Sequence, residues 1–259
     1  MTSEFIKVAQ AEGLATLTLD RPDKRNAMHG PLIAECLREL KKIAVDDSRV
    51  LIINGTGDNF CAGGDIGWMQ KIATTSDDEN YADAQSLADL LYTLYNFPKP
   101  TIVLAHGATL GGGLGLLSAA DIAIAAKNTS FSLPEVKIGI TPSMISPYVI
   151  AAIGERAAHY YFLTGERFGV DEARRLGLIH QIVESEALMS VGVTLAQSLL
   201  QSSPNALRAA KQLIRRVSKE KISQELAQKT AEHLAEIRRT PEAQEGLKAY
   251  LEKRKPSWV

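Results

Sequence analysis

Three consecutive glycines, Gly111 to Gly113, follow an apolar run that ends at Gly107 and open an Ala/Leu-rich stretch of helical character. Glycine lets another molecule approach the backbone closely, and the first N–H groups of a helix have no intrahelical acceptor. Such free donors suit a phosphate or an oxyanion. A lone glycine triplet is also explained by tight packing of a helix on a sheet, so the triplet alone leaves both interpretations open.

A second small-residue turn, Phe60 to Asp65 with the sequence FCAGGD, follows another apolar run, Val50 to Ile53. Each of the two turns could offer one backbone N–H to the same oxygen atom. The pair of turns therefore predicts a two-donor oxyanion hole, in which backbone amides stabilise negative charge as it develops.

Alternating strands and helices must position these turns. Short strands are expected at 5–8 and 14–19, then a helix from Pro31, a strand at 50–53, an exposed loop at 74–80, a helix at 81–96 and a strand at 101–105. This order predicts an α/β fold with parallel strands covered by helices. After Ser143 the chain is expected to be largely helical, with 178–183 extended; the expected helices are 143–153, 155–163, 170–176, 187–201, 205–217, 223–238 and 241–253.

Four segments carry a family resemblance: LDRPDKRNAM, FCAGGD, HGATLGGGLGL and SFSLPEVKIG. In order and spacing they resemble the enoyl-CoA hydratase/isomerase (crotonase) family, and the resemblance covers essentially the whole chain. It implies an α/β fold of the ClpP/crotonase type, with a ββα spiral core at 1–200. It also implies a C-terminal helical region at 201–259 that assembles homo-oligomers, either trimers or dimers of trimers.

The resemblance also assigns roles to individual residues. Gly64 and Gly112 match the family's two oxyanion donors, and Glu135 matches its general acid/base carboxylate. Without the family, Glu135 would read as a solvated surface charge. Buried beside an acyl pocket, its pKa is expected to rise, which suits proton transfer near neutral pH.

Coenzyme A would arrive as part of the substrate, and no separate cofactor is expected. The adenine of CoA is expected along the FCAGGD turn, at residues 62–66. Lys24 and Arg25 are candidates for binding its phosphates, although a solvated face explains two lone basic residues equally well. Tyr250 and Lys253 match family positions that reach a CoA site, often in a neighbouring subunit. The implied CoA-binding residues are Lys24, Arg25, Ala62, Gly64, Asp65, Ile66, Tyr250 and Lys253.

One position departs from the family pattern, because Gly115 stands where typical hydratases carry a second glutamate. A single base suffices for an enoyl-CoA isomerase, which is one alternative. The segment ITPSMISPYV instead resembles a bacterial branch that hydrates 3-methylglutaconyl-CoA to 3-hydroxy-3-methylglutaryl-CoA, and this is the preferred function. In that reading Gly115 leaves room in the pocket, and the substrate carboxylate, Ser143 or Ser146 positions the water. A non-catalytic acyl-CoA- or RNA-binding relative is the alternative from another class.

Composition excludes several other classes. The chain has 259 residues, 45% of them hydrophobic and 23% charged, with 29 basic and 30 acidic residues and a net charge of −1, which argues against nucleic acid as an obligate partner. Cys36 and Cys61 cannot form a disulfide framework, and a reducing, cytoplasmic setting is expected. The N-terminal sequence resembles no secretory signal, and no stretch is long enough for a membrane span. No metal site is expected, since these histidines are scattered: His106, His159, His180 and His233.

Overall fold

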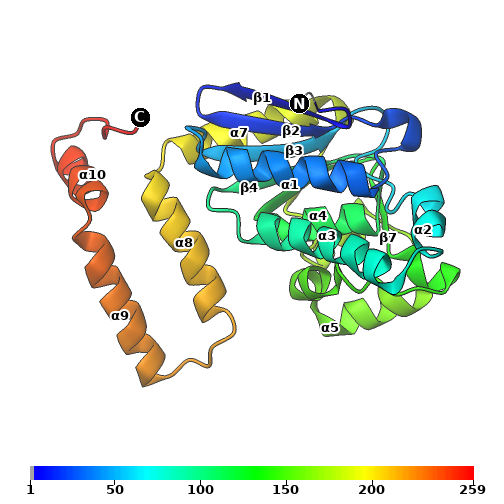
Figure 1. Ribbon diagram of the computed structural model, residues 1–259. Helices are drawn as coiled ribbons and strands as arrows, with labels where there is room; N and C mark the ends of the chain where they lie inside the picture. The colour runs from blue at the N-terminus through cyan, green and yellow to red at the C-terminus, as the bar shows by residue number, and fades with distance from the viewer. Residues whose placement is uncertain (1–2) are drawn as a thin grey trace.

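The computed structural model describes residues 3–259 and contains a six-stranded sheet in the order β1-β2-β3-β4-β6-β9 (Figure 1). β1 pairs antiparallel with β2, and every later neighbouring pair is parallel. The predicted α/β class with parallel strands is therefore confirmed. The strands are β1 (Ile6–Ala11), β2 (Leu14–Leu19), β3 (Val50–Gly55), β4 (Thr101–Ala105), β6 (Ile122–Ala126) and β9 (Gln181–Val183).

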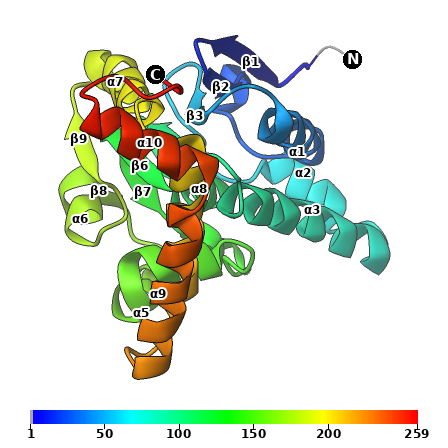
Figure 2. The ribbon, with the colours of Figure 1, turned by 90° about the vertical axis from the view of Figure 1, so that its left-hand side faces the viewer.

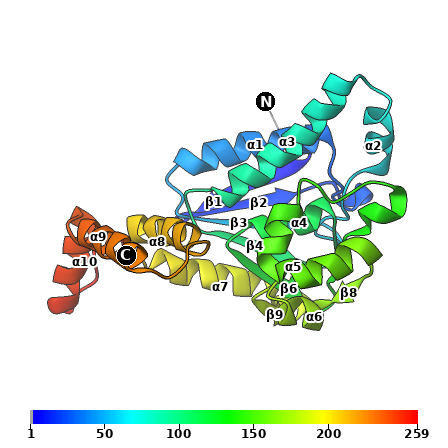
Figure 3. The same cartoon turned by 90° about the horizontal axis from the view of Figure 1, so that it is seen from below.

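Helices cover both faces of this sheet (Figure 3). Alternate residues of a strand point to opposite faces, so Leu51 and Ile53 of β3 pack with α1, α3 and α4, whereas Val50 and Ile52 pack with α7. Burial on both faces explains why β3 and β4 read as continuous apolar runs. These helices are α1 (Gly30–Val45), α3 (Asp77–Tyr95), α4 (Gly112–Ala119) and α7 (Leu188–Leu200).

A second sheet of three short strands was not predicted. It has the order β5-β7-β8, formed by β5 (Ala108–Leu110), β7 (Ser130–Ser132) and β8 (Phe168–Gly169). Strands of two or three residues are too short to show a period in the sequence. Thr109 of β5 also forms a bridge with Cys61, which ties the FCAGGD turn to the glycine triplet.

The expected loop at 74–80 is partly wrong, because α3 already begins at Asp77. Ser76 and Glu79 form a capping box, in which each side chain accepts a hydrogen bond from the other residue's backbone N–H. A short helix that was not predicted, α2 (Ile66–Ile72), precedes this loop and is capped by Asp65.

The region after Ser143 is largely helical, as predicted. The two expected helices at 143–153 and 155–163 form one element, α5 (Ser146–Thr164), with a break at Gly154, where φ is 76° and ψ is 158°. Glycine adopts this positive φ without steric cost. After α5 come α6 (Val170–Arg175) and the C-terminal α8 (Pro204–Val217), α9 (Gln224–Arg238) and α10 (Pro241–Leu251). Three short 3-10 helices lie elsewhere along the chain: η1 (Pro22–Lys24), η2 (Pro134–Ile138) and η3 (Ser185–Ala187).

Helices α8, α9 and α10 form an arm that leaves the body of the molecule (Figure 1) and faces the viewer in Figure 2. Neither α8 nor α9 contains a buried residue. At its far end the chain returns to the body, where Arg49 donates to the carbonyl oxygens of Trp258 and Ser202, at 2.7 Å each.

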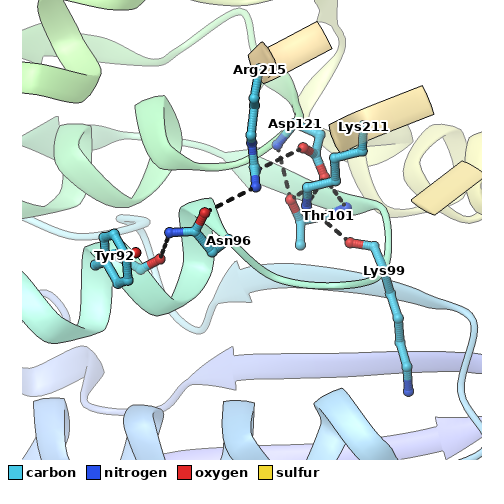
Figure 4. A network of polar contacts seen from close by, with 7 residues as sticks. All are labelled: Tyr92, Asn96, Lys99, Thr101, Asp121, Lys211 and Arg215. Carbon is cyan, nitrogen blue, oxygen red and sulfur yellow. Dashed lines mark hydrogen bonds and ion pairs between the residues drawn. The ribbon is translucent and has the colours of Figure 1, made fainter. Parts of the chain in front are cut away.

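Four polar residues attach α8 to the body, and we call them the arm junction: Thr101, Asp121, Lys211 and Arg215 (Figure 4). The Asp121 carboxylate accepts hydrogen bonds from the backbone N–H and the hydroxyl of Thr101, at 2.9 and 2.8 Å. Lys211 of α8 pairs with the same carboxylate at 2.5 Å, and Arg215 lies 3.8 Å from it. The Arg215 guanidinium also lies 4.1 Å from the centre of the Tyr95 ring.

Candidate active site

A pocket of about 180 Å³ lies where the two glycine turns meet η2 and the first turn of α1. It is at the carboxyl ends of the parallel strands, where open α/β sheets bind ligands. Most of its side chains are apolar, among them Met28, Ile33, Met69, Leu87, Met144 and Ile145. Its polar side chains in the described chain are His29, Trp68, Asp83, Glu135 and Thr141.

Gly64 lines this pocket, and Met28 holds the backbone on either side of it. The Met28 N–H donates to Gly63 O at 2.7 Å, and Met28 O accepts from the Asp65 N–H at 2.8 Å. Within residues 3–259 the Gly64 N–H itself donates to no acceptor. The FCAGGD turn therefore presents one free amide, that of Gly64, at the pocket wall, as the oxyanion-hole prediction requires.

Gly112 lines the same pocket as the first residue of α4. The preceding Gly111 has φ of 45°, a left-handed conformation that favours glycine, and its N–H donates to Ser132 O at 3.1 Å. The Gly112 N–H has no acceptor in the described chain, as expected at a helix start. A Cβ atom on Gly111 would lie 3.6 Å from Gly63 Cα, so the two turns are in contact.

Glu135 reaches the pocket from η2, directly beside the glycine triplet. Its Oε1 lies 2.8 Å from the position that a Cβ atom would take on Gly111. Its Oε2 is buried and has no hydrogen-bond partner among residues 3–259. Burial raises the pKa of this carboxyl above its usual value, as predicted from the sequence. The structure thus brings Gly64, Gly112 and Glu135 to one cavity.

The space beside Gly115 is filled, so the expectation that Gly115 leaves room in the pocket is wrong. A Cβ atom on Gly115 would lie 2.4 Å from Ile145 Cγ2 and 3.4 Å from Leu91 Cδ2. Ile145 thus takes up the volume into which a second glutamate would extend. The contact joins positions thirty residues apart, and the spacing of the motifs alone does not reveal it.

Ser143 and Ser146 do not line the pocket, which contradicts their expected role beside the reacting water. The Ser143 hydroxyl lies 2.6 Å from the Thr141 hydroxyl, and the Ser146 hydroxyl donates to Ser143 O at 2.8 Å. Both serines are therefore engaged within their own loop. From this loop Thr141 is the hydroxyl that does reach the pocket wall.

Of the candidate CoA residues in and around the FCAGGD turn, Ala62, Gly64 and Ile66 line the pocket, whereas Lys24, Arg25 and Asp65 do not. Lys24 and Arg25 are exposed, and Arg25 O accepts a hydrogen bond from the Ala62 N–H at 3.0 Å, which holds the basic turn beside the FCAGGD turn. Ala62 and Ile66 line the pocket, and Ile66 is 64% exposed. These positions agree with an extended ligand that enters between the basic turn and the FCAGGD turn.

Asp65 has a structural role in addition to its predicted one. Its carboxylate pairs with Arg21 at 2.7 Å and accepts from the Trp68 N–H at 3.0 Å, which caps α2. The Trp68 hydrogen bond and Arg21 keep the pKa of Asp65 below its usual value despite burial. A CoA contact at Asp65 remains a prediction.

Tyr250 and Lys253 lie at the end of α10 and not at the pocket of their own chain. In Figure 1 the arm lies at the left, whereas α2, which directly follows the FCAGGD turn, lies at the right. Tyr250 is 84% exposed. Any contact of these residues with CoA would therefore involve the pocket of another copy of the chain.

His29, Trp68 and Asp83 also line the pocket, and none of them was predicted from the sequence. His29 is 8% exposed, and its buried Nδ1 has no hydrogen-bond partner in the described part of the chain. Burial lowers the pKa of His29, and the nearby Arg21 lowers it further. The available signal was position: His29 directly follows the segment LDRPDKRNAM and precedes a helix start at Pro31.

Residues 3–259 contain no cluster of three or more His, Cys, Asp or Glu side chains that is placed to hold a metal ion. In the same residues, no helix combines the length and the apolar character that crossing a bilayer requires.

Comparison with known proteins agrees with this site. The family model for enoyl-CoA hydratase/isomerase matches residues 9–259. The 2,3-dehydroadipyl-CoA hydratase of Escherichia coli K12 is 32% identical over 260 residues, which are 99% of this chain and 98% of that protein. The carnitinyl-CoA dehydratase of the same strain is 31% identical over 261 residues, with 99% and 98% covered. The crystal structure of an enoyl-CoA hydratase from Shewanella pealeana superposes with a TM-score of 0.95 at 40% identity, over 99% of this chain and 96% of that one. The chain therefore belongs to the enoyl-CoA hydratase/isomerase (crotonase) family and is a hydratase-type enzyme, a hydro-lyase that acts on an acyl-CoA thioester.

Proposed function

We propose that this pocket adds water to a branched 2-enoyl-CoA, with 3-methylglutaconyl-CoA as the preferred substrate and 3-hydroxy-3-methylglutaryl-CoA as the product. The observation that carries the proposal is the Glu135 carboxylate, whose buried Oε2 has no partner, beside two free glycine amides. A carboxylate held in this way is available to a substrate proton.

The thioester oxygen would accept hydrogen bonds from the Gly64 and Gly112 amides. These donors stabilise the enolate-like transition state, and the loss of one such donor typically costs about 2.7 to 4 kcal/mol. Ionised Glu135 takes a proton from water as the water oxygen bonds to C3, and protonated Glu135 then delivers a proton to C2. Its raised pKa favours both transfers near neutral pH.

The acyl group is proposed from the loop that follows η2. Thr141, Met144 and Ile145 of ITPSMISPYV line the pocket, and Ile145 fills the space in front of Gly115. Overall identity does not choose the acyl group, because the two Escherichia coli relatives, at 32% and 31% identity, are named for acyl groups of opposite charge. The residues of this loop, which distinguish the resembled branch, support the glutaconyl substrate.

An enoyl-CoA Δ-isomerase is the second candidate, and a specific observation favours it. Among residues 3–259, Glu135 is the carboxylate of the pocket that lies beside the glycine turns, because Gly115 and Ile145 occupy the place of a second glutamate, and Asp83, the other carboxylate of the lining, accepts a hydrogen bond from Trp68. A single base is enough to move a double bond by shuttling one proton. The product distinguishes the two reactions, because only hydration adds a hydroxyl group.

We also propose that the 201–259 region assembles the chain into a trimer or a dimer of trimers. Apolar side chains on and near the arm are strongly exposed, with Ile222 at 99%, Leu251 at 81% and Ile214 at 65%. Contact with other copies would cover them and could bring Tyr250 and Lys253 to a neighbouring CoA site. Sedimentation velocity of the full chain is expected to show three or six copies, and a monomer at micromolar concentration would contradict the assembly.

A reducing, cytoplasmic location is proposed from the two cysteines. Cys36 and Cys61 are both free and buried in the core. Burial raises the pKa of each thiol, which keeps it unreactive.

The test of the proposed function follows the loss of enoyl-thioester ultraviolet absorbance with 3-methylglutaconyl-CoA and with crotonyl-CoA. Wild-type protein is expected to prefer the branched substrate, and Glu135→Gln is expected to abolish turnover of both. If neither substrate loses absorbance while a 3-enoyl-CoA gains it, the isomerase replaces the hydratase. Binding without any turnover would favour a non-catalytic acyl-CoA-binding protein.

A further inference from the structure

The start of α1 borders the pocket through His29, its N-cap residue, and Ile33, while the Trp68 ring packs over Gly30. α1 is 16 residues long, its first turn contains no acidic residue, and the His29 side chain makes no capping hydrogen bond. The N-terminus of a helix carries a partial positive charge and unsatisfied N–H groups. This helix end therefore favours an anion. The carboxylates of Asp65, Glu35 and Glu4 lie near enough to His29 to oppose the lowering of its pKa, but none of them caps the helix.

His29 provides a second and independent sign of a ligand. It is 8% exposed, and its buried Nδ1 has no partner among residues 3–259. Leaving a buried polar group unpaired is costly, and such groups in native proteins call for an explanation. The His29 ring packs edge-on against Phe5 and Trp68, with ring centroids 4.6 and 6.0 Å from its own. Trp68 in turn donates a 2.8 Å hydrogen bond from its indole N–H to the Asp83 carboxylate.

The rest of the pocket supplies little positive charge. Among the described residues no Lys or Arg lines it, and its two carboxylates are Asp83 and Glu135. The N-terminus of α2 is already capped by Asp65, and that of α4 carries the proposed oxyanion donor Gly112. The first turn of α1, with His29, is therefore the remaining electropositive part of the wall.

The two ends of a substrate can be assigned from the backbone around Met28. The Met28 Sδ lies 2.8 Å from the position of a Cβ atom on Gly112, so this side chain faces the reacting end. His29 follows in extended conformation, with φ of −144° and ψ of 163°, and packs instead against Trp68. Neighbouring side chains in extended backbone point in opposite directions, which separates His29 from the thioester site.

We propose that His29 and the first turn of α1 form a subsite for a second carboxylate at the distal end of the acyl group. His29 donates an imidazole N–H to this carboxylate, and the N-terminus of α1 adds electrostatic stabilisation. The inference rests on the proposed function and deepens it, because it makes His29 the residue that selects a dicarboxylic acyl thioester over a monocarboxylic one.

The test is a binding measurement that needs no turnover. Calorimetry compares 3-methylglutaryl-CoA with isovaleryl-CoA, two saturated ligands that share a branched skeleton and differ in the distal carboxylate. The variants are His29→Leu, which removes the donor, His29→Asn, which keeps one, and the control Ile33→Val in the same turn. If His29 donates a hydrogen bond to the charged carboxylate, His29→Leu should weaken the binding of 3-methylglutaryl-CoA by about 10- to 100-fold. The binding of isovaleryl-CoA should weaken by less than about threefold.

His29→Asn is expected to recover most of the affinity for 3-methylglutaryl-CoA, and Ile33→Val is expected to affect both ligands alike. The subsite is refuted if wild-type protein binds the two ligands equally, or if His29→Leu weakens both by the same factor. Hydration assays of the wild type judge the proposed function separately. If the wild-type protein hydrates neither substrate but still binds 3-methylglutaryl-CoA selectively through His29, the proposed reaction is rejected and the subsite is retained.

Discussion

Two carboxylates lie in protected parts of the molecule, Asp121 at the arm junction and Glu135 at the pocket, and their surroundings are opposite. Asp121 accepts from the Thr101 N–H and hydroxyl and pairs with Lys211, whereas Glu135 Oε2 has no partner in the described chain. Figure 4 shows how completely the junction is connected.

The difference separates architecture from chemistry. A desolvated charge is tolerated when opposite charges and hydrogen bonds compensate it, and Asp121 is compensated by groups from β4 and α8. Burial lowers the pKa of Lys211 although Asp121 opposes that effect, in keeping with the 10% exposure of the Lys211 side chain. Glu135 is left uncompensated, so its burial raises its pKa and keeps it ready to exchange a proton.

The same isosteric change, carboxylate to amide, should therefore have different consequences at the two sites. The largest effect is expected for Glu135→Gln on catalysis. Removal of a general acid/base group predicts a decrease in kcat of about 10²- to 10⁴-fold. Steady-state absorbance assays measure it, and a variant that keeps more than half of the wild-type kcat would show that Glu135 is not the proton-transfer group.

The next largest effect is expected for Asp121→Asn on stability. This change leaves Lys211, which is 10% exposed, without its charge partner. The free energy of unfolding should fall by about 2 to 3 kcal/mol, less than for a fully buried pair because the Asp121 side chain is 24% exposed. Urea unfolding measures the change against the exposed control Glu186→Gln. Equal stability of the two variants would show that the Asp121–Lys211 pair does not stabilise the fold.

A third prediction concerns the position of the missing glutamate. Gly115→Glu should destabilise the protein by about 1 to 3 kcal/mol without raising activity, because its Cβ atom would lie 2.4 Å from Ile145 Cγ2. Combined with Ile145→Ala, the loss in stability should be smaller than the sum of the two single losses. Additive losses in thermal or urea unfolding would show that Ile145 is not the obstacle.

The smallest effect is expected for Glu135→Gln on stability, and it has the opposite sign to that of Asp121→Asn. Since burial raises the folded-state pKa of Glu135 above its usual 4.5, the wild-type free energy of unfolding falls as pH rises through that raised pKa. The amide does not titrate, so the variant should be more stable than wild type at pH 7 and nearly equal to it at pH 4. Urea unfolding at both pH values checks this, and a less stable variant at pH 7 would contradict it.

The chemistry-bearing turns could be predicted from sequence because their signals are local. Gly111 needs a left-handed backbone, and the Pro134–Glu135 step begins a short helix, so residue type and position are informative there. The α/β order followed from apolar runs that are buried on both faces of the sheet.

What could not be predicted depends on contacts between distant residues. Ile145 against Gly115 is a packing relation that no local pattern encodes. The serines of ITPSMISPYV looked suited to hold water, yet the turn directs Ser143 toward Thr141 and Ser146 toward the Ser143 carbonyl. His29 gave no motif of its own, and its importance comes from burial without a partner beside Phe5 and Trp68.

The most direct test of the role of Glu135 measures turnover of a 2-enoyl-CoA and the free energy of unfolding side by side for Glu135→Gln and Asp121→Asn at pH 7. Glu135→Gln is expected to lose turnover by at least about a hundredfold while remaining at least as stable as wild type. Asp121→Asn is expected to lose about 2 to 3 kcal/mol of stability and, while folded, to keep wild-type turnover. A Glu135→Gln protein that still turns over substrate, or that loses turnover only because it unfolds, would contradict the assignment of Glu135 as the proton-transfer group.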